Sequence, residues 1–209
     1  MVSLAASRDA GTSARILDVA EELVQVRGFN GFSYADIAAE LGITKAALHY
    51  HFAGKADLGE ALIARYSSRF AESLIGIDAA AAGTAGAARA RLAGFADLYL
   101  DVLRNRRMCL CGMLAADYQT LPQPMRDAVL RFFDDSEAWL GSVLDSGRAD
   151  GSLSFAGPAS EQARMIIGSL EGAMLIARPY GDVGRFQAAA ENLLAGLTRP
   201  ADAAAPAQR

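Results

Sequence analysis

Two short helical segments separated by one glycine constrain this chain more than any other feature of its sequence. The first spans residues 33–41 and opens with Ser33-Tyr34-Ala35-Asp36, which has the Ser-x-x-acid form of a capping box. Gly42 ends it, and Thr44 can cap a second helix that runs to about Tyr50. Helix, tight turn and short helix at this spacing form the helix-turn-helix pattern. Since a helix of about seven residues is unstable alone in water, it must pack against its neighbours.

Amphipathic helices are expected on both sides of this pair. The preceding helix is capped by Thr12 or Ser13 and stops at Gly28, and a long fourth helix runs from Gly54 to about Ile77. Apolar positions recur every four residues along that fourth helix, at Leu58, Leu62, Tyr66 and Phe70. Further helices are expected near residues 86–105, 108–119, 124–146, 159–178 and 183–197. With only 6 Pro in 209 residues, the sequence predicts an all-α fold.

The composition narrows the class of protein. A hydrophobic content of 52% excludes disorder throughout the chain. No apolar run reaches the roughly 18–20 residues of a membrane span, and no signal peptide is recognisable, so we expect a cytoplasmic protein that does not contact membranes. Cys109 and Cys111 do not make a disulfide framework. No cofactor, metal site or catalytic residue is predicted, because no phosphate-binding glycine loop, metal-ligand cluster or nucleophile motif is present.

The net charge of −4 does not indicate that the protein as a whole attracts nucleic acid, so any DNA binding must use a local surface. Both lysines and both histidines lie within residues 44–55, TKAALHYHFAGK, whereas the other 18 cationic side chains are arginines. A helix N-terminus attracts phosphate, and small residues let a short helix enter the major groove. The residues of this stretch expected to face DNA are Thr44, Lys45, Ala46, His49, Tyr50 and Lys55.

This stretch has two other interpretations. His49 and His51 could form a zinc pair, but side chains two residues apart lie on different sides of a helix, and no Cys is near in sequence. A solvated charged face could explain Lys45 and Lys55, although it would not explain the helix-turn-helix spacing. We interpret His51 as structural.

The stretch GFNGFSYADIAAELGITKAALHYHFAGKADL resembles the DNA-binding domain of the TetR (tetracycline repressor) family of bacterial regulators. The similarity covers about residues 12–62, and its most specific part is Leu48-His49-Tyr50-His51-Phe52. The resemblance implies an all-α homodimer with an N-terminal three-helix DNA-binding domain. A long fourth helix would join it to a helical C-terminal domain that binds a small molecule and dimerises through its last two helices.

The resemblance also assigns residues and domains. Ser33 and Tyr34 would lie near phosphate at the start of the second helix, and Lys55 would contact another phosphate. His49 departs from the family, which usually has Tyr there, so operator affinity could acquire a dependence on pH. The predicted domains and flexible tails are residues 12–55 for DNA binding, 56–198 for ligand binding and dimerisation, and 1–11 and 199–209 for the tails.

The segment 161–178 is apolar on several sides and carries small residues that allow close helix contact. With the last helix it suits a four-helix dimer interface, and reading two grooves about 34 Å apart requires such a dimer. The alternative is an intramolecular core. The predicted interface residues are Ile167, Gly168, Leu170, Glu171, Met174, Leu175, Phe186, Leu193, Leu194 and Leu197.

A largely apolar small-molecule effector is expected in the C-terminal half, where aromatic and methionine side chains collect, although such residues are more often core. The predicted pocket residues are Phe95, Tyr99, Cys109, Met113, Tyr118, Phe132, Phe133, Trp139 and Met165.

The predicted function is a ligand-responsive repressor that binds a palindromic DNA operator as a dimer. Arg104, Arg106 and Arg107 precede Cys109 and Cys111, and nearby cations favour a reactive thiolate, so a redox or electrophile sensor is an alternative. Buried hydrophobic cysteines, a small thiol oxidoreductase, and an architectural or activating DNA-binding factor are the other interpretations.

Overall fold

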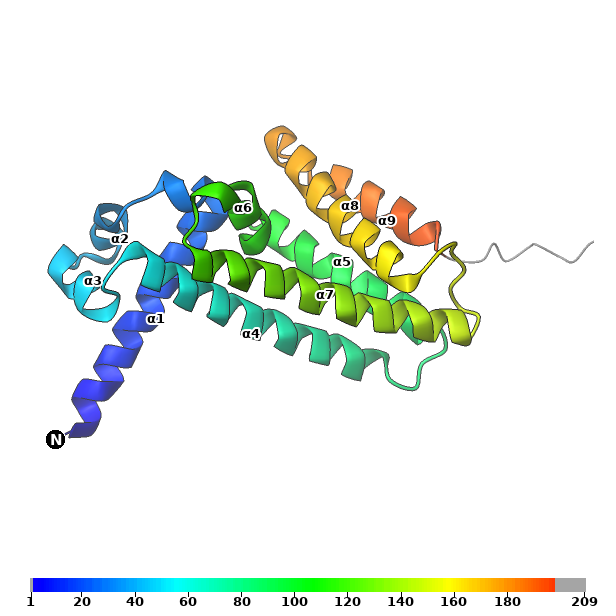
Figure 1. Cartoon of the computed structure of the whole chain (residues 1–209), viewed down its shortest axis with the longest axis horizontal. Coiled ribbons are helices and arrows are strands. Elements are labelled where there is room, and N and C mark those ends of the chain that lie inside the picture. Colours follow the sequence, from blue (N-terminus) through cyan, green and yellow to red (C-terminus); the bar gives the residue numbers. More distant parts are fainter. Residues whose placement is uncertain (1, 198–209) are drawn as a thin grey trace, which may run out of the picture. The chain divides into compact units, whose positions relative to one another are not determined.

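The computed structural model describes the backbone of residues 2–197 and the side chains of residues 11–197. Within these residues every element of regular secondary structure is a helix, which confirms the predicted all-α fold class (Figure 1). None of the helices in this part combines the length and apolarity that crossing a bilayer requires. The helices, with two 3-10 turns marked η, are α1 (Val2–Arg27), η1 (Phe29–Gly31), α2 (Tyr34–Leu41), α3 (Lys45–His51), α4 (Lys55–Ala81), α5 (Ala87–Arg104), α6 (Leu110–Ala116), η2 (Tyr118–Thr120), α7 (Gln123–Ala149), α8 (Ala159–Tyr180) and α9 (Val183–Ala195).

The helix boundaries differ most from the sequence-based expectation at two places. Helix α1 begins at Val2 instead of Thr12 or Ser13, so the predicted N-terminal tail is helical from its second residue. The predicted helix 108–119 is a shorter α6 followed by the 3-10 turn η2. The other predicted tail, residues 199–209, lies outside the described residues.

The chain divides into two compact units. The first joins Met1–Glu72 to Arg106–Phe133, and the second joins Ser73–Asn105 to Asp134–Arg209. The first unit therefore contains α6 and the start of α7 in addition to the helix-turn-helix.

The first unit is held together by an apolar core and by one ion-pair network. Ile16 and Val24 of α1 and Leu48 of α3 are fully buried there. The carboxylate of Glu21, only 8% exposed, accepts hydrogen bonds from Arg65 at 2.9 Å and Arg69 at 2.5 Å. Because a buried carboxylate is stable only when it is paired, this network ties α1 to α4 and fixes the support on which α2 and α3 pack.

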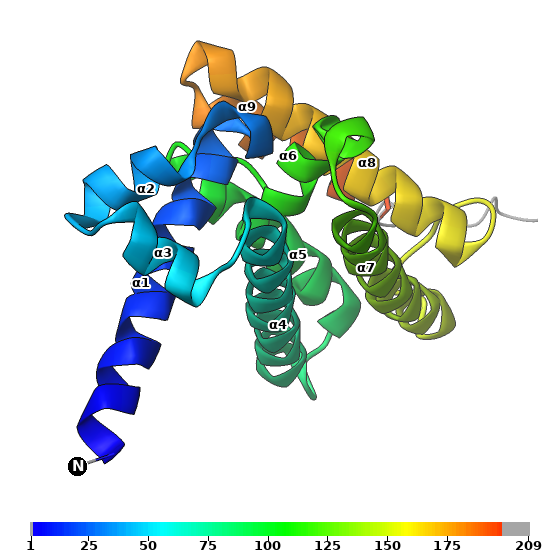
Figure 2. The same ribbon diagram turned by 60° about the vertical axis from the view of Figure 1, so that its left-hand side comes forward.

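The second unit consists mainly of α5, α8 and α9 with the adjoining parts of α4 and α7. Helices α8 and α9 lie side by side, as both ribbon views show (Figures 1 and 2). Phe95 of α5 stacks on Trp139 of α7 with ring centroids 5.7 Å apart, and the Trp139 indole donates to Asp78 at 3.0 Å. Asp78 also pairs with Arg91 at 2.9 Å. This polar network connects three helices of the unit.

Candidate nucleic-acid interface

Helix α2 starts with the capping box that the sequence predicts. The Ser33 hydroxyl accepts the Ala35 amide at 3.2 Å, while the Asp36 carboxylate accepts both the amide and the hydroxyl of Ser33 at 2.7 Å. These hydrogen bonds hold the pKa of Asp36 below its usual value. Because the Ser33 hydroxyl donates to a carboxylate, the structure places it as a helix cap and not as the predicted phosphate contact.

The turn between α2 and α3 is set by Gly42. This residue is left-handed, with φ of 65°, a conformation that glycine adopts without the penalty of a Cβ atom. Two residues later the Thr44 hydroxyl accepts the Ala47 amide at 3.1 Å and caps α3, as predicted. The turn and the cap together fix the direction in which α3 leaves α2.

Helix α3 has one buried face and one exposed face. Leu48 is fully buried and Phe52 is 8% exposed, whereas Tyr50 is 77% exposed. Five of the residues predicted to face DNA form the solvent-exposed side: Thr44, Lys45, Ala46, His49 and Tyr50. The helix, light blue to cyan in Figure 1, thus presents hydroxyls, one ammonium group and one imidazole around a single small side chain.

Tyr34 is half-buried and its hydroxyl is bonded within the domain, which differs from the predicted phosphate contact. Its hydroxyl donates to the Phe52 carbonyl at 3.1 Å, and its ring lies 4.8 Å from the imidazole of His49. Burial, helped by the Asp57 carboxylate, raises the pKa of Tyr34 to about 12. The side chain therefore remains a neutral donor and joins the start of α2 to the end of α3.

The contact of His49 with the backbone determines which ring nitrogen carries a proton. Nδ1 lies 3.0 Å from the carbonyl oxygen of Ala53. Since a carbonyl only accepts, Nδ1 must be the protonated nitrogen, and in the neutral ring Nε2 is left as an acceptor. Neutral His49 can accept from a base amino group, but it can donate to a phosphate oxygen only after gaining a second proton.

Lys55 is also turned inward. Its ammonium group donates to the carbonyls of Phe29 and Phe32 and lies 4.7 Å and 4.1 Å from the centroids of their rings. Burial lowers the pKa of Lys55, and the carboxylates of Asp117 and Asp36 oppose that shift. These contacts differ from the predicted phosphate contact, because the donors of the side chain are directed at the loop before α2.

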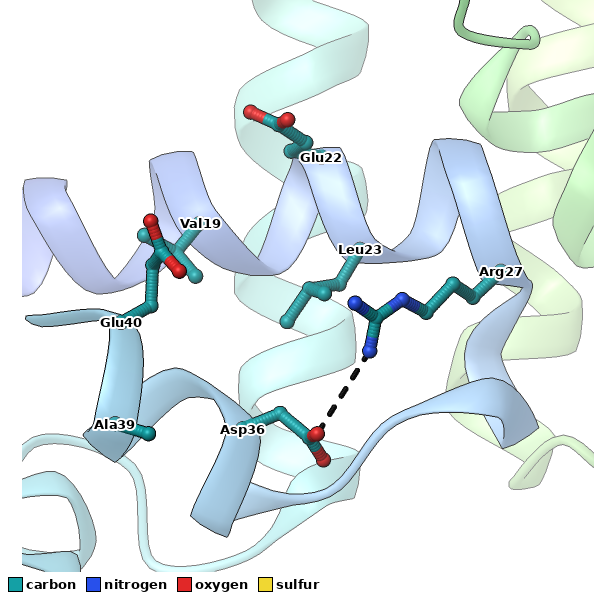
Figure 3. Close-up of a pocket in the computed structure, with 7 residues that line it drawn as sticks. All are labelled: Val19, Glu22, Leu23, Arg27, Asp36, Ala39 and Glu40. Atoms are coloured by element: carbon teal, nitrogen blue, oxygen red, sulfur yellow. Dashed lines mark ion pairs between the residues drawn. The ribbon is translucent and has the colours of Figure 1, made fainter.

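A groove of about 420 Å³ lies between α1 and α2 on the same unit (Figure 3). Its charged side chains are three carboxylates, Glu22, Asp36 and Glu40, and the guanidinium of Arg27, which pairs with Asp36 at 3.7 Å. Val19 and Leu23 supply its apolar wall. Three carboxylates against one guanidinium make the groove a poor site for phosphate.

The predicted pocket residues are divided between the two units. In the first unit, Phe132 contacts the rings of Phe70 and Phe133, Cys109 is buried at the start of α6, and Tyr118 stacks with Arg126. In the second unit, Phe95 joins Tyr99 and Trp139 in one aromatic cluster. Met165 is 46% exposed on the outside of α8, which contradicts its assignment to an enclosed pocket.

The predicted interface residues separate into three groups. Those that are buried within the second unit, and so form its core, are Ile167, Leu170, Met174, Phe186 and Leu197. Glu171, Leu193 and Leu194 are half-buried, while Gly168 and Leu175 are exposed. Sequence periodicity missed Ile176 and Tyr180, whose side chains are 60% and 62% exposed.

Comparisons with known proteins agree with this architecture. Residues 16–62 match the family of bacterial regulatory proteins named for tetR, and residues 88–193 match the tetracyclin repressor-like C-terminal domain. The chain is similar to a TetR-family transcriptional regulator from Agrobacterium tumefaciens, at 28% identity and a TM-score of 0.86 over 91% of this chain and all of the other. A TetR transcriptional regulator from Legionella pneumophila is 32% identical, with a TM-score of 0.78 over 88% and 96% of the two chains.

A third relative is the HTH-type transcriptional repressor NemR of Escherichia coli strain K12. It is 24% identical over 190 residues, which are 88% of this chain and 94% of that protein. The crystal structure of its reduced form has the same fold, with a TM-score of 0.76 over 91% and 99% of the two chains. Both halves of the sequence and the arrangement of its helices thus lead to one assignment: the chain belongs to the TetR family of bacterial transcriptional regulators.

Proposed function

We propose that the protein is a repressor that binds a palindromic DNA operator as a homodimer and releases it when a small molecule binds. The observation that carries the proposal is the exposed side of α3, where Thr44, Lys45, His49 and Tyr50 surround Ala46. Hydroxyls and cations on a slim helix suit phosphate and base contacts in a major groove. The acidic groove between α1 and α2 leaves that side as the DNA-binding face of the unit.

The test is a binding titration of the full chain on DNA upstream of its own gene, with unrelated DNA as competitor. Tyr50→Ala is the informative variant, because Tyr50 is 77% exposed and its loss leaves the core intact. We expect footprinted, competitor-resistant binding that this variant loses while its melting temperature is unchanged. Binding that is non-specific and insensitive to the substitution would reject the assignment of α3. A promoter reporter then separates repression from activation.

Dimerisation is proposed to use the outer face of α8. Its exposed apolar and small residues follow helical spacing along one stripe: Met165, Gly168, Gly172, Leu175 and Ile176. A Cβ atom built on Gly168 or Gly172 meets nothing within 4 Å, so a partner helix has room to approach closely there. Burying the stripe would remove exposed leucine and isoleucine side chains from water, which favours association.

The effector is proposed to bind in the second unit and to be largely apolar. One proposed position is the aromatic cluster of Phe95, Tyr99 and Trp139, which would have to open to admit such a molecule, because Phe95 and Tyr99 are 0% and 2% exposed. A separate groove of about 250 Å³ in the same unit includes Leu194, one of the predicted interface residues, and is lined by Arg89, Leu92, Ala93, Leu153, Glu191, Leu194 and Ala195. Thermal stabilisation of the protein by candidate compounds tests effector binding without requiring DNA.

Thiol sensing is a second candidate for the signal. The Cys109 sulfur accepts the Gly112 amide at 3.4 Å and the Tyr66 hydroxyl at 3.8 Å. Two of the three arginines that suggested reactivity are engaged elsewhere, since Arg104 pairs with Asp101 and Arg107 with Glu22. Both sulfurs are buried, so an electrophile must enter the first unit to reach them.

A further inference from the structure

The loop between α1 and α2 is held by polar groups from two distant parts of the first unit. Residues 28–32, GFNGF, form the 3-10 turn η1, and Ser33 follows as the cap of α2. Phe29 and Phe32 are each 6% exposed, so the backbone between them runs close to the core. The amides and carbonyls of such a loop need partners, because an unpaired buried polar group is destabilising.

Asp117 supplies the acceptor for the loop amides. It lies at the end of α6, and its Oδ2 accepts the Phe29 amide at 2.7 Å and the Asn30 amide at 3.4 Å. The Asn30 side chain extends this contact by donating to the Thr120 hydroxyl at 2.7 Å. Gly28 permits the close approach, since a Cβ atom there would lie 3.0 Å from the same carboxylate oxygen.

Lys55 supplies the donor for the loop carbonyls. It stands in the first turn of α4, and its ammonium group binds the Phe29 and Phe32 carbonyls. The peptide groups of one short loop thus lie between a carboxylate from α6 and an ammonium group from α4. The Asp117 carboxylate also favours the charged form of Lys55, so the two side chains stabilise each other across the loop.

We infer that Asp117 and Lys55 act as positioning residues that together hold residues 28–32, and we call this pair the loop clamp. Through the loop clamp, the end of α6 sets the position of α2 and hence the affinity for DNA. The inference rests on the proposed function and deepens it by naming the contact through which α6 acts on the DNA-binding helices. A state of the protein in which α6 withdraws Asp117 leaves the Phe29 amide without its acceptor and frees the start of α2. Binding of DNA and closure of the clamp must then favour each other reciprocally.

The experiment measures amide hydrogen exchange and DNA binding on the full chain. Asp117→Ala removes the acceptor, and Asp117→Asn keeps one acceptor oxygen without the charge. Asp127→Ala is the matched control, because this half-buried carboxylate of the same unit bonds only within α7, to Gln123 at 2.8 Å. We expect the Phe29 and Asn30 amides to exchange about tenfold faster or more in Asp117→Ala, less in Asp117→Asn, and at the wild-type rate in the control.

DNA binding supplies the second readout. Asp117→Ala and Lys55→Met should each weaken binding about tenfold while the slope of log affinity against log salt stays as in the wild type. A slope that falls by about 0.9 in Lys55→Met would mean a direct phosphate contact and would overturn the role given to Lys55. Unchanged exchange at Phe29 and Asn30 in Asp117→Ala would overturn the clamp.

The two proposals fail separately. If the wild-type protein binds no DNA specifically, the proposed function fails, yet the exchange rates still decide whether the clamp exists. If Asp117→Ala does not fold, Asp117→Asn decides on the same two amides. Saturating operator DNA should slow exchange at Phe29 and Asn30 in the wild type, and faster exchange on binding would contradict the inference.

Discussion

The hydroxyl of Tyr34 donates to the backbone carbonyl of Phe52, so the first residue of α2 holds the residue that ends α3. The same ring packs against His49 on the exposed side of α3. One side chain therefore fixes both the angle between the two helices and the orientation of a residue proposed to contact DNA. Tyr34 therefore supports the exposed side of α3 through its contacts with Phe52 and His49.

Replacing Tyr34 with Phe should lower the free energy of unfolding by about 1 kcal/mol, because the Phe52 carbonyl loses its partner while the ring is kept. The folded state holds the Tyr34 proton more tightly than the unfolded state, with a pKa of about 12 against 10.0. The wild-type advantage is therefore complete below pH 10 and is lost as pH rises towards 12. Urea denaturation of both proteins across this range measures the effect. An advantage that persists at pH 12 would contradict the assignment.

His49 should make operator binding depend on pH. Because Nδ1 donates to Ala53, only the doubly protonated ring can offer Nε2–H to a phosphate. We expect affinity to fall more between pH 6 and pH 8 in the wild type than in His49→Tyr, whose hydroxyl stays protonated. Titrations at constant ionic strength provide the comparison, and equal slopes for the two proteins would reject the idea.

A charge on the outer face of α8 should separate the proposed dimer. Leu175→Glu occurs twice in a two-fold interface, and each copy forfeits about 1.5–3 kcal/mol of apolar burial, so association should weaken about 100-fold or more. Sedimentation velocity over a concentration series measures this. Leu130→Glu serves as the control, since it makes the same change at an exposed leucine of α7. If both variants dissociate to the same extent, or if neither dissociates, α8 is not the interface.

The thiol alternative has its own test. Single Cys109→Ser and Cys111→Ser proteins should lose release from DNA by oxidants or electrophiles if a thiol is the sensor, while affinity for DNA without the reagent stays the same. Mobility shifts with and without the reagent give the answer. If the reagent releases DNA equally from the wild type and from both variants, neither thiol is the sensor, and binding of a small molecule remains the proposed signal. Turnover of a disulfide substrate, lost in the double variant, would instead indicate an oxidoreductase.

The parts of the fold that follow local rules were predictable from the sequence. Ser33, Gly42 and Thr44 each act on residues within four positions of themselves, and the structure places caps and turn where these residues predict them. Leu48 and Phe52 lie four residues apart, a spacing that puts two side chains on one side of a helix, and the structure buries both.

Contacts between residues distant in sequence were not predictable. Asp117 lies 88 residues from the Phe29 amide that it accepts, and Glu21 lies 44 residues from Arg65. No periodicity reports such pairs, so Lys55 could be identified as a functional cation but not as one turned toward the loop. On α8 the difficulty was that both faces are apolar. Met174 is fully buried and Leu175 is 58% exposed, a distinction that depends on where α9 packs.

The carboxylates between α1 and α2 also affect how quickly the protein finds its site. Near DNA, an approach that presents Glu22 and Glu40 is opposed by the phosphates, whereas one that presents Lys45 is favoured, so the unit turns before it touches the duplex. In a protein of net charge −4, this asymmetry keeps unproductive encounters short. If the proposed function holds, the groove thereby gives the search for the operator a direction.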